Sequence, residues 1–371
     1  MLLIILSTAL VLGVLIFVHE LGHFLVAKRS GVTVLRFSLG FGPKIAAITR
    51  GTTEYRLSMI PLGGYVKMLG EDAEEEEEQK LTPEEKAGSF SEASVWKRLA
   101  IVFAGPFSNF LFAIIVFALI FAFSGLQELA PIIGTVNPGS PAQTAGLKNG
   151  DTIVSIDGKP IKTWDDLSES IEKHGPTPLN FVVKRGAQTL ALTVTPAISA
   201  VKNLFGESVK RPLIGITSAE KIIVKPVNPL QACYYSLAHT WDLSRLFFMT
   251  IVKLVERVVP LKDLGGPILI AQMAGKQAHR GFVDLLNFMA FISVNLAVIN
   301  LMPIPILDGG HIFFFLIEAV QGRPLSLKKI EVAQKVGLVA LLSLMVVVFY
   351  NDLARLDWTS LTSWFGNFWA K

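Results

Sequence analysis

Four long apolar runs restrict what this chain can fold into. They cover residues 1–27, 99–127, 285–310 and 336–354, and the last run is the shortest. A helix needs roughly 20 apolar residues to cross a bilayer. The chain as a whole is 51% hydrophobic and only 17% charged, which is too apolar for an ordinary soluble protein. We therefore expect a multi-pass α-helical membrane protein with about four spans.

The first run could instead be a secretory signal peptide that is later removed. Such a peptide begins with a positively charged segment, whereas the opening stretch MLLIILSTAL carries no charged side chain. We therefore expect residues 1–27 to be retained as the first transmembrane helix.

Positively charged residues beside the spans predict which segments face the cytoplasm, because lysine and arginine accumulate on that side. They flank the segment 28–98 and occur within 311–335, whereas no cation directly follows the second span. We expect these two segments to be cytoplasmic and residues 128–284 to face outward, as do both termini, including the tail 355–371. The cations that predict this orientation are Lys28, Arg29, Lys97, Arg98, Arg323, Lys328, Lys329 and Lys335.

The cytoplasmic segment 28–98 contains a predicted β-region. Apolar and polar residues alternate from 53 to 59, a Pro-Leu-Gly-Gly turn follows at 61–64, and a second strand returns at 65–69. The apolar content of this hairpin suits an element that re-enters the membrane. Residues 71–85 include five consecutive glutamates and predict a solvated loop.

Residues 128–200 have the pattern of a separate domain. The stretch GSPAQTAGLKNGDTIVSIDG closely resembles bacterial PDZ domains, so we expect one inserted PDZ-like α/β domain. PDZ domains bind extended peptide or protein ends by adding a strand to a sheet edge; a spacer that restricts access sterically is the alternative. Residues 201–284 then form a predicted linker with amphipathic segments at the membrane interface.

The first span contains the pentapeptide HELGH, which places His19 and His23 one turn apart on the same face of a helix. Two imidazoles in that arrangement can bind one metal ion, and Glu20 beside them can take a proton from water. A single histidine on an apolar face is usually an ordinary core residue. Three ionisable groups inside a membrane span are costly unless they are partnered, so we interpret them as a metal site.

Catalytic zinc typically has three protein ligands, so one more is needed. Asp308 lies at the inner end of the third span, and Pro303 and Pro305 would break that helix and present the carboxylate. The predicted orientation puts Asp308 on the same side of the membrane as HELGH. An ordinary Asp-Gly turn is the alternative for Asp308, and His311 is a rival ligand or a residue that supports the ligands.

The ordered motifs of this chain resemble those of bacterial site-2 proteases, which are intramembrane zinc metalloproteases. The resemblance covers nearly the whole chain and implies that His19, His23 and Asp308 bind Zn2+ and that Glu20 is the catalytic base. The motifs that carry it are HELGH, GFGP, IPLGGYVKMLGE, AGPFSNF, the PDZ-like pattern, GGPI and NLMPIPILDGGH.

The same resemblance implies that Asn295 and Asn300 contact substrate or steady the site. Its implied substrates are single-pass membrane proteins, namely anti-sigma factors and remnant signal peptides. The implied location is the bacterial inner membrane, with the active site near the cytoplasmic side and the PDZ domain outside. This chain departs from the members that carry two tandem PDZ domains, because it has one recognisable copy.

A helical substrate must be extended locally before attack, because its carbonyls are already hydrogen-bonded. The 53–69 hairpin could bind the extended stretch by strand addition, which replaces the lost helix bonds. Gly63 and Gly64 would permit close backbone approach, and the strand of Tyr65, Val66 and Lys67 would pair with the substrate.

Two other functions fit parts of the sequence. A metal-dependent transporter would also carry polar groups within its spans, but this chain has no repeated half. A non-catalytic membrane-anchored PDZ scaffold would have no need of Glu20 beside its metal. No block of lysine and arginine alternates with aromatic residues, so nucleic-acid binding is not expected. The single cysteine, Cys233, excludes an intramolecular disulfide and a CxxC metal site.

Overall fold

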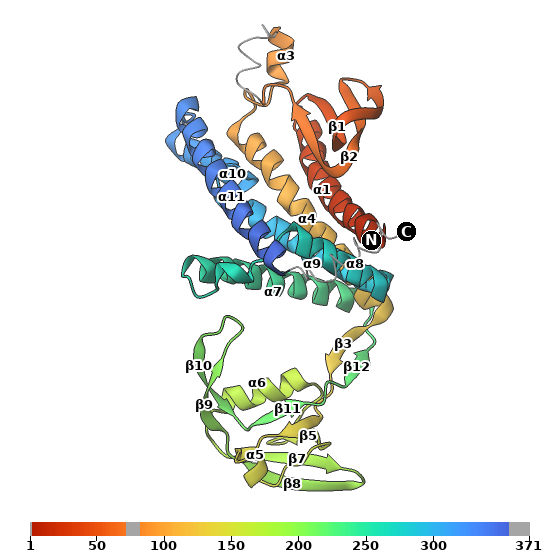
Figure 1. Ribbon diagram of the computed structural model, residues 1–371, viewed down its shortest axis with the longest axis vertical. Coiled ribbons are helices and arrows are strands. Elements are labelled where there is room, and N and C mark those ends of the chain that lie inside the picture. Colours follow the sequence, from red (N-terminus) through yellow and green to blue (C-terminus); the bar gives the residue numbers. More distant parts are fainter. Residues whose placement is uncertain (1, 72–81, 356–371) are drawn as a thin grey trace, which may run out of the picture. The chain divides into compact units, whose positions relative to one another are not determined.

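The computed structural model describes residues 2–71 and 82–355 (Figure 1). The chain divides into two compact units. The first unit consists of Met1–Ala118, Cys233–Leu254 and Pro260–Lys371, and the second of Leu119–Ala232 and Val255–Val259. Most of the predicted glutamate-rich loop and almost all of the predicted tail lie outside the described residues.

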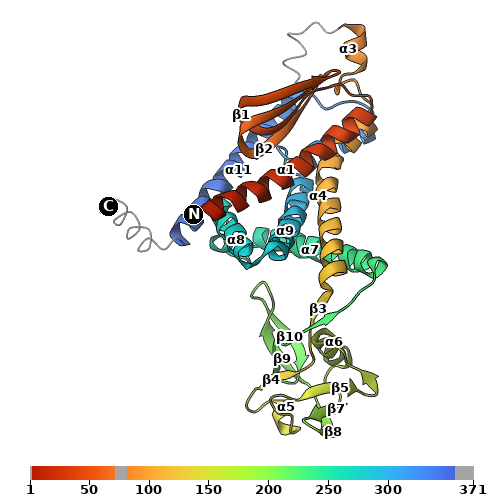
Figure 2. The ribbon, with the colours of Figure 1, turned by 90° about the vertical axis from the view of Figure 1, so that its right-hand side faces the viewer.

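Four helices of the described residues are long and apolar enough to cross a membrane, which agrees with the expected number. They are α1 (Leu2–Arg29), α4 (Val95–Ser124), α9 (Phe282–Leu301) and α11 (Leu327–Arg355). Figures 1 and 2 show α1, α4 and α9 packed together, and apolar side chains of all three meet in one core cluster. In α11, by contrast, only 6% of the apolar stretch is buried. Its exposed apolar surface therefore suits contact with lipid.

The predicted third span was too long. Helix α9 ends at Leu301, the next residue is extended, and a separate helix, α10 (Asp308–Gln321), begins at the aspartate. The two prolines of the sequence NLMPIPILDGGH lie in this break, as expected, because proline cannot continue a helix. The predicted loop 311–335 was wrong for a related reason. It contains most of α10 and the charged first turns of α11, which hydropathy alone does not reveal as helix.

The β-region is more complex than the predicted hairpin. Strands β1 (Val34–Arg50) and β2 (Thr53–Met68) are long and bent, and their tight turn lies at Gly51. The Pro-Leu-Gly-Gly stretch lies inside β2 and is not the predicted turn. Residues 36–39 pair with 64–67 on one side and with 54–57 on the other, so the order across the sheet is 64–68, 34–39, 53–58 and 44–50. Positive φ angles at Gly40, Gly42 and Gly63 permit the bends that a local pattern does not predict.

This sheet lies alongside the C-terminal half of α1 (Figure 2). Phe24 of the helix packs against Phe37 of the sheet, with ring centroids 4.9 Å apart. The far half of the sheet exposes apolar side chains: Phe41, Ile45, Ile48, Leu57, Met59 and Ile60. A short helix, α3 (Pro83–Ala87), with a capping box at Thr82, precedes α4.

The second unit holds the PDZ-like segment. Its central sheet has the order β6-β5-β7-β8 and packs on the helices α5 (Pro141–Thr144) and α6 (Trp164–His174) around a buried core. The sheet strands are β5 (Thr152–Ile156), β6 (Lys159–Pro160), β7 (Leu179–Arg185) and β8 (Gln188–Val194).

The predicted domain end at residue 200 was too early. Strand β11 (Ile216–Ser218) pairs with β4 (Ile133–Val136), and β12 (Ile222–Lys225) pairs with β3 (Leu126–Leu129). A hairpin of β9 (Ala197–Lys202) and β10 (Ser208–Leu213) leads into them. These pairings join residues far apart in sequence. Local sequence patterns do not reveal such pairings, so they predict a linker where β11 and β12 lie.

The rest of the predicted linker consists largely of helix in the first unit. It comprises α7 (Pro229–Val255), the single turn η1 (Leu261–Asp263) and α8 (Pro267–Arg280). Asp352 of α11 accepts backbone hydrogen bonds from Gly266, Ile268 and Leu269 at the start of α8, with distances of 2.9, 2.9 and 3.2 Å. Because Gly266 has no side chain to cap this helix, the carboxylate from α11 satisfies its first N–H groups instead.

Candidate metal centre

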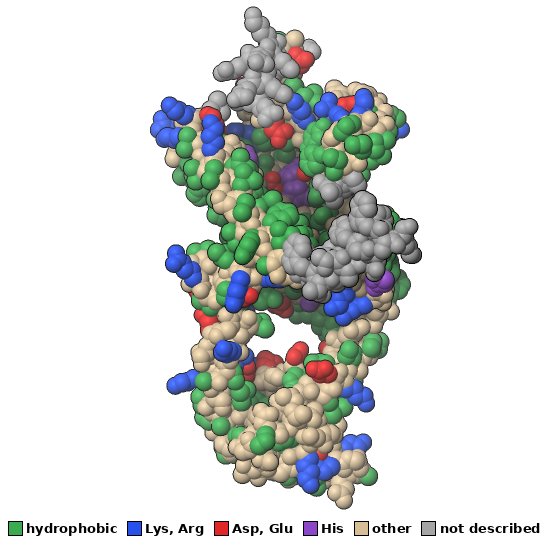
Figure 3. All heavy atoms as spheres, viewed as in Figure 1, with side chains coloured by type: hydrophobic (Ala, Val, Ile, Leu, Met, Phe, Trp, Pro, Cys, Tyr) green, Lys and Arg blue, Asp and Glu red, His purple; other side chains and the backbone are tan. Residues whose placement is uncertain are grey.

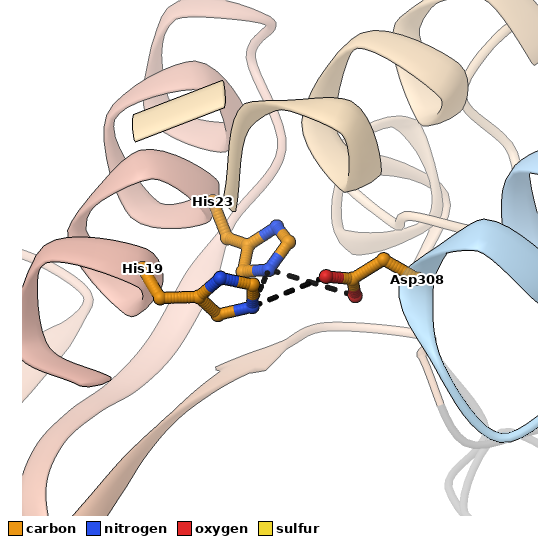
Figure 4. Close-up of side chains that lie close together, drawn as sticks. All are labelled: His19, His23 and Asp308. Carbon is orange, nitrogen blue, oxygen red and sulfur yellow. Dashed lines mark hydrogen bonds and ion pairs between the residues drawn. The ribbon is translucent and has the colours of Figure 1, made fainter. Parts of the chain in front are cut away.

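Three side chains from two helices converge inside the first unit (Figure 4). His19 and His23 project from α1, and Asp308 comes from the first residue of α10. The two imidazole Nε2 atoms are 3.2 Å apart, and the Asp308 carboxylate oxygens lie 3.1 Å from His19 Nε2 and 3.7 Å from His23 Nε2. In Figure 3, histidine and acidic side chains are visible in a hollow between hydrophobic walls. The three side chains are 12–20% exposed, so water can reach a partly enclosed site.

The hydrogen bonds behind the imidazoles decide what their Nε2 atoms can do. His23 Nδ1 lies 2.8 Å from the carbonyl oxygen of Ile101, which only accepts, so Nδ1 must carry the proton. The Nε2 atom of a neutral His23 then bears a lone pair. Its neighbours at the centre are His19 Nε2 and Asp308 Oδ1. The other carboxylate oxygen, Asp308 Oδ2, faces His19 Nε2 and accepts no hydrogen bond of good geometry.

Acceptors that face one another repel unless a cation lies between them. Bonds of 2.0–2.1 Å to a tetrahedral zinc ion would separate its ligand atoms by roughly 3.3 Å. The observed separations of 3.1, 3.2 and 3.7 Å match that value. The residues present therefore fit one metal ion of this kind.

Helix α4 supports both histidines. Asn109 is fully buried, and its side-chain nitrogen lies 3.3 Å from His19 Nδ1, while its side-chain oxygen has no partner. Amide oxygen and nitrogen are assigned from their partners. If His19 Nδ1 carries the proton, as at His23, the amide must be turned so that its oxygen accepts. The sequence AGPFSNF contains Asn109, but nothing in the sequence alone indicated its role.

Close helix packing makes room for this arrangement. A Cβ atom at Gly105 of α4 would collide with the His23 imidazole, and one at Gly22 of α1 would collide with the backbone of Ala104. Ser293 of α9 donates a hydrogen bond of 2.8 Å to the Asn109 carbonyl, which ties a third helix to the same point.

Glu20 lies against strand β2. A Cβ atom on Gly64 would lie 3.4 Å from Glu20 Cγ and 2.7 Å from the Ser38 carbonyl oxygen, so only glycine fits between the sheet and the helix. The backbone of Val66 hydrogen-bonds the Glu20 carboxylate. Gly63 packs against the Phe41 ring. The Phe41 and Tyr65 rings are stacked, with centroids 6.0 Å apart.

The other predicted residues lie outside the three-ligand group. Asn295 and Asn300 are half-buried on α9, and neither side chain makes a hydrogen bond within residues 2–71 and 82–355. His311 lies one turn along α10 from Asp308 and contacts the rings of Phe314 and Phe315. It does not belong to the group of converging ligand atoms.

A partly buried ion pair holds the helix that carries Asp308. Arg98 at the start of α4 contacts Glu318 of α10 at 2.5 Å, and both side chains are 14% exposed. The Arg98 guanidinium also lies 4.8 Å from the centre of the Phe315 ring. Sequence reasoning used Arg98 only to predict orientation and missed this contact between residues 220 positions apart.

Comparison with known proteins agrees with this chemistry. The model of peptidase family M50 matches residues 7–344. "Putative zinc metalloprotease Atu1380" of Agrobacterium fabrum is 38% identical over 358 residues, covering 94% of each chain. "Putative zinc metalloprotease Cj1068" of Campylobacter jejuni is 39% identical over 351 residues, covering 95% of this chain and 93% of its own.

Solved PDZ domains match a smaller part of the chain. The HtrA3 PDZ domain, bound to a phage-derived ligand, is 32% identical over 18% of this chain and 58% of its own, with a TM-score of 0.17. The PDZ domain of an SdrC-like protein from Listeria monocytogenes is 23% identical over 24% of this chain and 84% of its own, with a TM-score of 0.20.

The family match decides between the functions that the sequence left open, because it favours a zinc-dependent peptidase over a transporter or a non-catalytic scaffold. This chain belongs to peptidase family M50, the site-2 protease family, and is a zinc metalloprotease.

Proposed function

We propose that the protein is an intramembrane endopeptidase that hydrolyses peptide bonds within the transmembrane segments of single-pass membrane proteins. The observation that carries this proposal is the convergence of His19, His23 and Asp308 on helices of which α1 is long and apolar enough to span a bilayer. A peptidase site built on such helices would meet substrates within the membrane. Anti-sigma factors and remnant signal peptides are the proposed substrates.

We assign the roles as follows. His19, His23 and Asp308 would hold zinc, which when bound supplies Lewis-acid chemistry that polarises a carbonyl and acidifies a water molecule. Glu20 lies next to His19 on the same helix and would accept the proton of the attacking water. The same carboxyl would then deliver that proton to the departing amine. The hydrogen bonds from His19 and His23 to α4 would keep both imidazoles oriented throughout.

The substrate would be extended along the free edge of β2. Residues 64–68 pair with β1 on one side, and no other described strand pairs with their second side. The Met68 N–H donates to Glu71, away from β1, at 3.1 Å. The N–H of Val66, two residues earlier, points the same way because strand residues alternate. These two N–H groups face the carboxylates of Glu20 and Glu71, so a substrate strand added at this edge would exchange carboxylate oxygens for its own carbonyl oxygens directly beside Glu20.

The proposed orientation puts the metal centre near the cytoplasmic side of a bacterial inner membrane and the PDZ-like unit outside. It rests on the cations that flank residues 28–98. The PDZ-like unit would then bind peptide or protein ends, or exclude large outer domains, before the substrate reaches the zinc. Asn295 and Asn300, whose amides are unpaired among the described residues, would contact substrate backbone.

The substitution Glu20→Gln tests the proposal. The amide keeps the shape of the side chain but cannot accept the proton, so turnover should fall by about 10²–10⁴ while one zinc ion per chain is retained. Membrane proteomics of cells with wild-type or Glu20→Gln protein should reveal fragments with intact transmembrane segments that accumulate only with the variant. Turnover within about tenfold of wild type would contradict the assignment of the base.

A further inference from the structure

A second polar site lies in the first unit, lined by residues other than those of the metal centre. A cavity of about 410 Å³ is formed where α4, α7, α8 and α9 meet. Its apolar wall includes Phe117, Phe288 and Phe291, and its polar groups include Arg280 and Asp284. This volume lies within the range of about 300–1,000 Å³ that is usual for small-molecule sites.

The two charged side chains of this cavity are exposed, and neither has an oppositely charged partner among the described residues. Arg280 is in the last turn of α8 and Asp284 in the first turn of α9, so each complements the dipole of its own helix. A structural role of that kind explains why these residue types occur there. It does not explain why both face one cavity, since neither side chain is in a hydrogen bond or ion pair with any described residue.

The place of the cavity along the spans limits what can occupy it. Asp284 lies two residues after the start of α9, and Phe117 lies seven residues before the end of α4. The charged part of the cavity is therefore at the level where membrane-spanning helices end and lipid headgroups begin. His239 and Leu243 of α7 also line the cavity. The His239 and Phe117 rings are nearly perpendicular, with centroids 4.7 Å apart.

We propose that this cavity binds the zwitterionic headgroup of an aminophospholipid. The phosphate would accept hydrogen bonds from the Arg280 guanidinium, the ammonium would donate to the Asp284 carboxylate, and the chains would follow the phenylalanine wall. An anionic headgroup or a peptide carboxylate offers one negative charge, which would satisfy Arg280 but be repelled by Asp284. A single ligand that carries both charges satisfies both residues.

Native mass spectrometry of the full-length protein tests this proposal with short-chain phosphatidylethanolamine, phosphatidylglycerol and phosphatidylcholine of equal chain length. Wild-type protein should retain phosphatidylethanolamine most strongly. Arg280→Gln should weaken its retention at least tenfold, as the loss of a charged hydrogen bond predicts. Asp284→Asn should remove the preference for phosphatidylethanolamine over phosphatidylglycerol.

Matched controls separate this site from ordinary lipid contact. Lys276→Gln changes an exposed cation of α8 that does not line the cavity, and Asp263→Asn changes an exposed acid of η1. Both should bind phosphatidylethanolamine as wild type does, and so should Glu20→Gln, because the site does not depend on hydrolysis. Equal retention in all variants would overturn the proposal. So would phosphatidylglycerol binding that ignores Asp284→Asn, or displacement of the lipid by a peptide with a free carboxyl end.

Discussion

At the scale of single residues, the metal centre depends on hydrogen bonds that lie behind the two histidines. Ile101 and Asn109 are both on α4, and each faces the Nδ1 atom of one imidazole. Such partners fix which nitrogen carries the proton and leave the other for the metal. The backbone carbonyl of Ile101 cannot be removed by substitution, whereas the Asn109 side chain can.

We predict that Asn109→Leu lowers zinc affinity about 10- to 100-fold, because it removes the acceptor for His19 Nδ1 while nearly keeping the volume. The measurement is a titration of purified protein against a competing chelator. Asn109→Asp restores an acceptor and should recover most of the affinity. Asn295→Leu, a similar change on α9, should leave zinc binding unchanged. Wild-type affinity in Asn109→Leu would mean that His19 needs no such partner.

A second prediction concerns the third ligand. Asp308→Ala should lower zinc content well below one per chain, because two imidazoles alone hold zinc weakly compared with three ligands. Metal analysis after dialysis measures this directly. His311→Ala is the control, and it should retain zinc because His311 lies outside the converging atoms. The opposite result, with zinc kept in Asp308→Ala and lost in His311→Ala, would make His311 the ligand.

At the scale of elements, the bent sheet places one strand edge against the catalytic helix. Within residues 64–68, alternate N–H groups face β1 and the free edge. Proline removes one N–H, so its effect depends on which side that N–H serves. The two positions Val66 and Lys67 are therefore not equivalent, although both belong to the predicted clamp.

We predict that Val66→Pro slows cleavage of a helix-stable transmembrane substrate while the sheet and the zinc site remain intact, because proline is tolerated where the N–H faces away from the ladder. Lys67→Pro should instead destabilise the sheet itself. Val66→Ala is the matched control for the lost side chain, which is 9% exposed and packs in the core beside α1. Val66→Pro also removes the backbone hydrogen bond to Glu20, and a substrate with helix-breaking residues separates the two effects. That substrate should be cleaved nearly normally by Val66→Pro if the loss is at the clamp, and as slowly as the helix-stable substrate if the loss is at Glu20. Full activity of Val66→Pro on the helix-stable substrate would exclude this strand as the clamp.

At the scale of the whole molecule, the chain divides into a mainly helical unit with the metal centre and a PDZ-like unit whose first and last strands, β3 and β12, pair with each other. Leu126 of β3 is paired with Lys225 of β12, so the chain enters and leaves the PDZ-like unit at neighbouring points. Paired residues of antiparallel strands are only about 5 Å apart. Residues 126–225 can therefore be replaced by a short glycine linker, whereas removal of 131–196 would delete β4 and leave β11 without its partner.

We predict that the 126–225 deletion keeps zinc and still cleaves substrates that lack an outer domain, because no residue of the metal centre lies in that segment. It should also cleave substrates with an intact outer domain that the full chain rejects. Cleavage assays with both substrate types and a zinc determination test this. Unchanged substrate selection by the folded deletion variant would show that the PDZ-like unit is not a filter.

The sequence alone determined the local chemistry and the broad architecture of this protein. The spacing of HELGH follows from the helical repeat, so His19 and His23 had to share a face wherever the helix lay. Four apolar stretches and the helix break at Pro303 and Pro305 are likewise local properties, and the structure has them. The motifs of the chain also predicted its family.

Only the tertiary structure decided which distant residues contact one another. Three contacts of the site join residues between 44 and 220 positions apart: Asn109 with His19, Arg98 with Glu318, and Gly64 with Glu20. The double pairing of residues 36–39 and the closing strands β11 and β12 are of the same kind. Local propensity contains no information about such contacts, because they depend on how whole helices and strands pack once their apolar faces are buried.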